Sequence, residues 1–309
     1  MMNKKIITTL LFVSVCVIWG TTWMAMEMAV QSIPAITATG LRFLFSAPLL
    51  ILLACKCKVP LFFPKDKKQE FILISLFYFA FPFTLMIYGE QYISSGLASL
   101  IFANMPVIML VFSLFRHKQK IQFHQCLGLG VALVCLMMII SNEIGIKANG
   151  SIFGVIALFS AVLMHASIYS SVQNRCKGIH ILTYNAVPCL VAGLLLVVGT
   201  ILEQPQWQTF TLLSFGAVIY LGVIAGIGGI MAYFQLNKMA SPFQASLCFL
   251  IFPVIALALD SLVNGRNISH DSYLLSVILL LGVFMCKLPL STLNKIKIKC
   301  YSISFKKFP

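Results

Sequence analysis

The sequence predicts an all-α membrane protein of ten transmembrane helices, arranged as two inverted five-helix repeats. The chain of 309 residues is 60% hydrophobic, its mean hydropathy is +0.98, and 10% of its residues are charged. Soluble globular chains carry roughly 25% charged residues, so lipid must cover most of this surface. Residues 98–107 and 245–254 also agree at six of ten positions, which indicates two related halves.

Ten apolar stretches follow one another, and most match the roughly 20 residues that cross a hydrocarbon core about 30 Å thick. Lys4 and Lys5 precede the first stretch as in a signal peptide. That stretch is too long and lacks an Ala-x-Ala cleavage pattern, so we expect an anchored helix. The predicted spans are residues 6–30, 34–55, 71–89, 93–115, 126–141, 151–172, 179–202, 210–235, 241–263 and 272–290.

The two halves are predicted to enter the membrane from opposite faces, because each holds an odd number of spans. We expect the first repeat over residues 1–141, a polar linker over 142–150 and the second repeat over 151–290. Residues 291–309 form a basic tail without an apolar run long enough to cross the bilayer. In inverted repeats a substrate site lies near the midplane, where the halves meet and rock against each other.

Basic residues set the predicted orientation. The net charge is +14, and 19 of the 22 lysines and arginines fall on one side of the ten-span arrangement. Lys147 and Arg266 lie on the other side, and Arg42 falls within a span. The positive-inside rule then places both termini in the cytoplasm, with the chain in the inner membrane. The positive net charge is therefore explained by the membrane topology, with anionic lipid as a secondary partner of the basic residues. We expect no nucleic-acid partner.

The sequence holds no motif for covalent or metal chemistry. Most of the ten cysteines lie inside apolar stretches, and Cys55 and Cys57 have no partners at metal-ligand spacing. Nucleophile-elbow, zinc-protease and phosphate-loop motifs are absent, and no span carries two carboxylates spaced for acid–base work. We therefore expect no enzyme activity, no metal site and no cofactor.

Three charged side chains are predicted within the membrane or at its edge, where such groups are costly and mark functional sites. Arg42 lies about 12 Å inside the second span. It either binds a substrate carboxylate or pairs with Glu27 of the preceding antiparallel helix. Asp260, near the outer end of the ninth span, either takes up a proton or extends to water. For both residues the structural interpretation is the favoured one.

Five side chains are predicted to line a central substrate site: Trp19, Trp23, Asn104, His165 and Tyr169. Trp19 and Trp23 are four residues apart and share one helix face. His165 is central in the sixth span, where it can donate, accept or take a proton. A shift of 146 residues places it opposite Trp19 in the repeat. A histidine satisfied within helix packing is the alternative.

Proline marks the middle of the fourth and ninth spans, where it frees a backbone carbonyl and kinks the helix. Pro106 follows Asn104 by two residues. Pro253 recurs in the second repeat, with Ile251 in place of the asparagine. The sequence therefore predicts two kinks, one of them polar, with simple packing of Asn104 as the alternative.

Four motifs follow in order along the chain. They are Trp19-Gly-Thr-Thr-Trp23, Leu41-Arg-Phe43, residues 92–100 with Pro106, and the glycine-rich residues 128–134. Together with the ten spans, they resemble the EamA family of the drug/metabolite transporter superfamily over nearly the whole chain. The resemblance implies a permease for small metabolites, commonly an exporter of amino acids or related compounds, with a central cavity between its halves.

The chain departs from the family pattern at three places. Lys118-Gln119-Lys120 and Asn264-Gly265-Arg266 stand where the family usually ends its fourth and ninth helices with Leu-Gly-Glu. His165 stands where the family usually has a tryptophan. The missing glutamates argue against ion pairs at those helix ends, and His165 implies a more polar cavity.

The combined prediction is a secondary transporter that moves a small polar metabolite, such as an amino acid, by alternating access, with export favoured. Uptake of a metabolite or nucleotide-type cofactor by exchange is the alternative within transport. A non-transporting membrane receptor or assembly factor is the alternative outside it. The expected partners are the metabolite and membrane lipid.

Overall fold

A computed structural model describes residues 4–117, 122–144, 151–172, 175–240, 245, 247–266 and 269–287. The regular elements of these residues are helical. They are α1 (Lys4–Ala29), α2 (Ala35–Lys56), η1 (Lys65–Lys67), α3 (Lys68–Ile74), η2 (Ser75–Ala80), α4 (Phe81–Gly89), α5 (Ser95–Ala103), α6 (Met105–His117), α7 (Phe123–Ile144), α8 (Ser151–Val172), α9 (Ile181–Glu203), η3 (Trp207–Thr209), α10 (Leu212–Tyr220), η4 (Leu221–Gly229), α11 (Ile230–Met239), α13 (Cys248–Asn264) and α14 (His270–Lys287). The predicted linker beyond Ile144, Lys118-Gln119-Lys120 and the tail at 291–309 lie outside the described residues.

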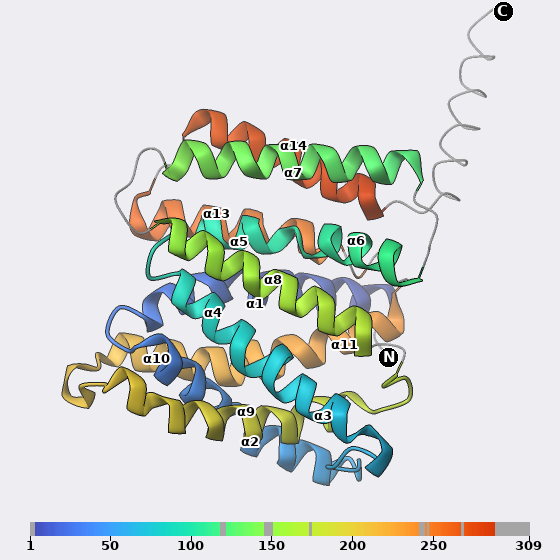
Figure 1. Ribbon diagram of the computed structural model, residues 1–309, viewed down its shortest axis with the longest axis vertical. Helices are drawn as coiled ribbons and strands as arrows, with labels where there is room; N and C mark the ends of the chain where they lie inside the picture. Colours follow the sequence, from blue (N-terminus) through green and yellow to red (C-terminus); the bar gives the residue numbers. More distant parts are fainter. Residues whose placement is uncertain are drawn as a thin grey trace, which may run out of the picture.

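Seven helical segments of this part of the chain are long and apolar enough to cross a membrane, and three shorter apolar helices accompany them. The seven are Lys5–Ala29, Ala35–Lys56, Lys65–Gly89, Phe123–Asn142, Ser151–Tyr169, Ile181–Glu203 and Leu212–Met239, and the three are Ser95–Met109, Cys248–Asn264 and His270–Met285. Figure 1 shows these segments side by side in one bundle, with the N-terminus and the end of α14 at the same edge. The regular structure of the described residues is therefore all helical, and the chain is a multi-pass membrane protein.

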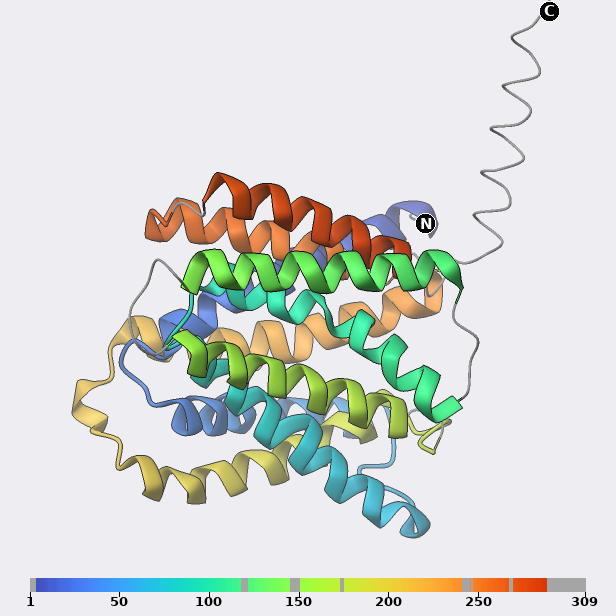
Figure 2. The same ribbon diagram turned by 45° about the horizontal axis from the view of Figure 1, so that its top comes forward.

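Helices of the first half pack against helices of the second half in matched pairs. α2 packs along α9, α7 along α14, and α5 along α13. α1 packs against α10, η4 and α11, while α8 packs against α3, η2 and α4. Exchanging the two halves leaves the first three pairs unchanged and turns the contacts of α1 into those of α8, as a twofold axis relating two repeats requires. Figures 1 and 2 both show α7 and α14 as neighbours near the top of the bundle.

A wider π-helical segment interrupts a helix at the same place in each half. η2 joins α3 to α4, η4 joins α10 to α11, and the two segments begin 146 residues apart. Glycine allows η4 to approach α2 closely, since a Cβ on Gly222 would lie 2.6 Å from the carbonyl oxygen of Arg42. π-helical segments frequently occur at functional sites.

A carboxylate of the second half caps the start of α2. Pro34 at the cap position offers no side-chain acceptor, so the first amides of this helix need another partner. Glu203, at the end of α9, accepts hydrogen bonds from the backbone N–H of Ile36 at 2.7 Å and of Thr37 at 2.8 Å. A negative charge at a helix N-terminus is favourable, so this contact fixes one end of the α2–α9 pair.

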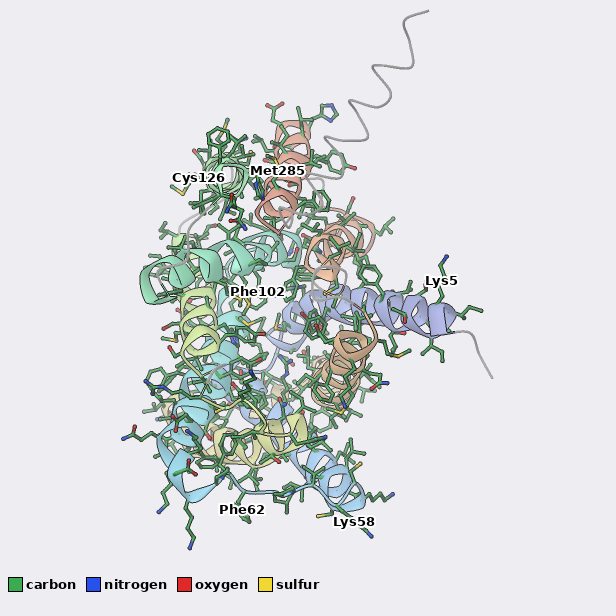
Figure 3. All side chains as sticks on the ribbon, turned by 90° about the vertical axis from the view of Figure 1, so that its right-hand side faces the viewer. Lys5, Lys58, Phe62, Phe102, Cys126 and Met285 are labelled. Carbon is green, nitrogen blue, oxygen red and sulfur yellow. The ribbon has the colours of Figure 1, made fainter. Side chains whose placement is uncertain are left out.

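The core between the halves is built from side chains of both. One buried cluster contains Trp23 and Met26 of α1, Leu100 of α5, Leu158 of α8 and Phe252 of α13. Figure 3 views the bundle nearly along its helices. Phe102 lies in the middle of this view, with Lys58 and Phe62 at one end of it and Cys126 and Met285 at the other. The candidate site lies within this shared core.

Candidate functional site

His165 lies among aromatic side chains inside the bundle. Its side chain is only 3% exposed. Its ring centroid lies 5.0 Å from that of Tyr78, 5.2 Å from Phe83 and 5.8 Å from Phe102, each in an edge-on arrangement. No side chain or backbone group of the described residues forms a hydrogen bond with its Nε2. A buried nitrogen without a partner is costly, so this atom is free to bind a ligand.

Arg42 projects from α2 onto the same phenylalanine. The residue is 5% exposed, and its guanidinium carbon lies 4.6 Å from the ring centroid of Phe83. Its Nη1 lies 3.9 Å from the sulfur of Met26, and its Nε has no hydrogen-bond partner in the described part of the chain. Arg42 and His165 therefore contact one aromatic ring, and each keeps a polar nitrogen unsatisfied.

The ion pair predicted between Arg42 and Glu27 is wrong. The ion pairs among the described residues include none with Arg42, and Glu27 binds Arg266 instead. A desolvated cation–π contact is worth roughly 2 kcal/mol, whereas burying an ion costs several kcal/mol even after relaxation. The contact with Phe83 does not offset the burial of this charge.

A series of ring contacts connects Trp19 to His165 across the interface of the halves. Trp19 lies 6.4 Å from Phe252 of α13, which stacks on Trp23 at 6.3 Å. Trp23 lies 5.3 Å from Phe102, which in turn contacts His165. Trp19 and His165, which the repeat places opposite each other, are thus linked through the rings of Phe252, Trp23 and Phe102.

Asn104 occupies the break between α5 and α6 and is fully buried. Its Nδ2 donates to the carbonyl of Leu100 at 2.9 Å, and its Oδ1 has no partner in the described structure. Pro106 is the second residue of α6, so the interruption falls where its ring cannot continue the helix. Pro253 lies inside α13, which continues through it.

Tyr169, the fifth predicted site residue, lies one turn beyond His165 on α8 and is 37% exposed. It therefore stands closer to the edge of the site than the others. Sequence reasoning missed Phe83, which joins Arg42 to His165, and Phe102, which joins His165 to Trp23. No local signal distinguished these residues among the 25 phenylalanines of the chain.

A second polar cluster closes one end of the bundle. Glu27 accepts from the backbone N–H of Ser95 at 3.2 Å, and Asp260 accepts from that of Gly96 at 3.2 Å, so both carboxylates cap α5. Arg266 pairs with both acids, directly with Glu27 and at 3.6 Å with Asp260, and Asn264 bridges them. The interpretation that Asp260 extends to water is wrong, because the residue is 1% exposed. The expected absence of ion pairs at this helix end is wrong as well.

Glu90 is the unpaired member of this cluster and lies in the turn after α4, outside the span that ends at Gly89. It is 4% exposed, and neither carboxylate oxygen has a hydrogen-bond partner among the described residues. Burial holds the pKa of Glu90 well above 4.5, and the neighbouring Glu27 and Asp260 raise it further. Arg266 lowers the pKa of Glu90 but does not cancel this rise.

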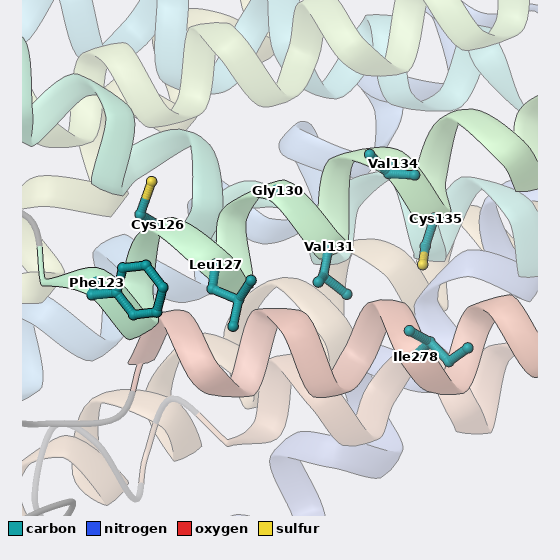
Figure 4. Close-up of a pocket in the computed structure, with 8 residues that line it drawn as sticks. All are labelled: Phe123, Cys126, Leu127, Gly130, Val131, Val134, Cys135 and Ile278. Carbon is teal, nitrogen blue, oxygen red and sulfur yellow. The ribbon is translucent and has the colours of Figure 1, made fainter.

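An apolar groove of about 600 Å³ lies apart from both clusters, on the α7–α14 pair. Figure 4 shows its wall of α7 side chains from Phe123 to Cys135, with Ile278 of α14 opposite. The groove offers almost no polar surface, so it suits lipid rather than a polar metabolite. Within the described part of the chain, no cluster of His, Cys, Asp or Glu side chains is suited to hold a metal ion.

Comparisons with known proteins agree with this arrangement. The model of the EamA-like transporter family matches residues 6–141 and 152–287. The chain is 45% identical over 283 residues to protein PagO of Salmonella typhimurium, covering 91% of this chain and 93% of that one. It is 41% identical to an uncharacterized transporter of Buchnera aphidicola, covering 94% and 98%.

A more distant relative and a solved structure also match most of the chain. The chain is 29% identical to the uncharacterized inner membrane transporter YedA of Escherichia coli, covering 90% of this chain and 88% of that one. A solved structure at 16% identity superposes with a TM-score of 0.64 over 90% of this chain and 95% of that one. The two family matches cover the two halves separately, in keeping with the paired helix contacts. The chain is a multi-pass inner-membrane protein and belongs to the EamA-like transporter family.

Proposed function

We propose that the protein is a secondary transporter that moves a small polar metabolite by alternating access, with export of an amino acid favoured. The observation that carries the proposal is the pair of unsatisfied polar atoms, His165 Nε2 and Asn104 Oδ1, inside a core shared by the two halves. Soluble and membrane cores normally satisfy such atoms. A substrate hydroxyl, amine or carboxylate would supply the missing partners.

The kinds of side chain in this core support the same function. Trp23, Phe102 and Phe252, which are linked by ring contacts, would provide apolar walls, while the unsatisfied atoms of His165 and Asn104 would offer a few polar contacts to orient a ligand. In ten-span inverted repeats, rocking of the halves about such a site exposes it to each side in turn.

The two π-helical segments support movement of this kind. Tyr78 of η2 contacts His165, and Gly229 of η4 approaches the indole of Trp19, so both segments border the site. Backbone hydrogen bonds in π-helical turns are less regular than in an α-helix, and these segments can absorb small changes in helix direction. Their equivalent positions in the two halves suit a symmetric exchange between two open states.

The experiment compares wild-type protein with His165→Ala in proteoliposomes loaded with each of the common amino acids in labelled form. We expect wild-type vesicles to release at least one amino acid faster than protein-free vesicles, and His165→Ala to lose most of that release. His270→Ala, at the exposed start of α14, is the matched control and should transport normally. Equal release by wild-type and His165→Ala would reject the site, and no release of any amino acid would reject the proposed substrate.

A further inference from the structure

Arg42 carries a positive charge for which the described part of the protein supplies no counter-ion. The carboxylates that form ion pairs or caps do so elsewhere in the bundle. Their partners are Arg266 for Glu27 and Asp260, Arg175 for Glu70, Lys67 for Asp66, and the first amides of α2 for Glu203. Arg42 is nevertheless only 5% exposed, and it is the eighth residue of α2, an apolar helix long enough to cross a membrane.

A purely structural role accounts poorly for this arrangement. Arg42 donates only a long contact to the sulfur of Met26, and its Nε donates to nothing among the described residues. A methionine or leucine at this position would pack against Phe83 without carrying a charge into the membrane. A residue whose contacts do not offset its cost to stability is typical of a binding site.

The position of Arg42 points to the ligand. Its guanidinium and the ring of His165 both contact Phe83, at 4.6 Å and 5.2 Å, and both carry an unsatisfied nitrogen. Two nitrogen groups next to one aromatic ring suit an oxygen-bearing anion, which accepts several hydrogen bonds at once.

We propose that Arg42 binds an oxyanion of the transported substrate, a carboxylate or a phosphate, with the imidazole of His165 beside it as a second donor. This proposal rests on the transport function proposed above and narrows the substrate to anions and to zwitterions such as amino acids. The substrate then neutralises the buried charge, so the occupied carrier is more stable than the empty one.

The first measurement uses the ligand-free protein in nanodiscs. Arg42→Met should unfold at the same temperature as the wild type or higher, because the substitution removes an uncompensated charge and keeps an apolar stem. Arg175→Met is the matched control, since Arg175 is half-exposed and pairs with Glu70 at 3.8 Å. A marked fall in the unfolding temperature of Arg42→Met, with Arg175→Met unchanged, would show a structural role and overturn the proposal.

The second measurement adds sodium lactate, sodium glutamate or sodium phosphate, each compared with sodium chloride at the same ionic strength. At least one oxyanion should raise the unfolding temperature of wild type and of Arg175→Met, and the anion that does so distinguishes carboxylate from phosphate. Arg42→Met should bind that anion at least about tenfold more weakly, and Arg42→Lys, a point charge without the planar fork, should lie between. No shift in the wild type, or an equal shift in Arg42→Met, would overturn the proposal.

The two proposals fail in different ways. If His165→Ala loses transport and Arg42→Met keeps it, the transport proposal stands and the anion site at Arg42 is rejected. If anions stabilise the wild type but not Arg42→Met, and the wild type transports nothing, the anion site stands and the transport proposal is rejected.

Discussion

At the scale of single residues, Glu90 shows how burial of one carboxyl controls stability. Its pKa lies well above 4.5 in the folded protein, because burial and the nearby Glu27 and Asp260 disfavour the ionised form. In the unfolded chain the same group ionises near 4.5. The folded state therefore holds one more proton between these two pKa values, and its stability falls as the pH rises through that window.

Glu90→Gln should remove this dependence, because glutamine has no proton to lose. We expect the variant to unfold at a higher temperature than the wild type at about pH 7.5, and the difference to shrink towards about pH 4.5. Thermal unfolding in detergent at several pH values measures this. Asp66→Asn is the control, since the Asp66 side chain is 73% exposed. The prediction would be contradicted if the unfolding temperatures of wild type and Glu90→Gln changed with pH in parallel.

At the scale of helices, the close approach of η4 to α2 depends on a glycine. A Cβ on Gly222 would lie 2.6 Å from the Arg42 carbonyl oxygen and 3.0 Å from Cβ of Phe45. Ser46 reinforces the contact, since its hydroxyl donates to the carbonyl of Gly222 at 2.7 Å. Gly222→Ala should therefore push the two helices apart and cost about 1–3 kcal/mol of unfolding free energy.

The chain provides a matched control for that substitution. A Cβ on Gly216, in α10 of the same span, would meet no atom within 4 Å. Gly216→Ala should be neutral or stabilise by up to about 1 kcal/mol, because alanine favours helix more than glycine does. Equal effects of the two substitutions on thermal unfolding would show that the contact between η4 and α2 is not tight.

Helix positions followed in part from the sequence, but helix faces did not. The second span was expected at 34–55 and α2 covers Ala35–Lys56, because a run of 20 apolar residues is a strong signal. Arg42 and Glu27 were matched by depth alone, which says nothing about the direction in which each side chain points. Arg266 lies 239 residues from Glu27, and no local pattern indicates such a partner.

The residues of the candidate site were also only partly predictable from the sequence. Asn104 and His165 stood out because polar groups are costly inside membrane spans, and Trp23 because it shares a helix face with Trp19. Phe83 and Phe102 are ordinary membrane residues, and only the fold shows that they connect Arg42, His165 and Trp23. The π-helical segments at Ser75–Ala80 and Leu221–Gly229 were also missed.

At the scale of the whole molecule, the two edges of the bundle differ in charge. One edge carries the link between α2 and α3, with Lys56, Lys58 and Lys65, and Figure 1 shows the N-terminus at that same edge. The opposite edge carries the link between α9 and α10, which contains no basic residue. The positive-inside rule then predicts that the first edge faces the cytoplasm.

Cysteine labelling of intact cells tests this orientation. Gln208 lies in the exposed link between α9 and α10, and Gln208→Cys in a chain otherwise free of cysteine should react with a membrane-impermeant maleimide. Native Cys57, exposed beside Lys58 and retained as the sole cysteine, should react only after the cells are permeabilised. The reverse pattern would invert the topology. The acidic cluster of Glu27, Asp260 and Arg266 would then close the cytoplasmic end of the bundle, and the basic loops would face outward against the charge rule.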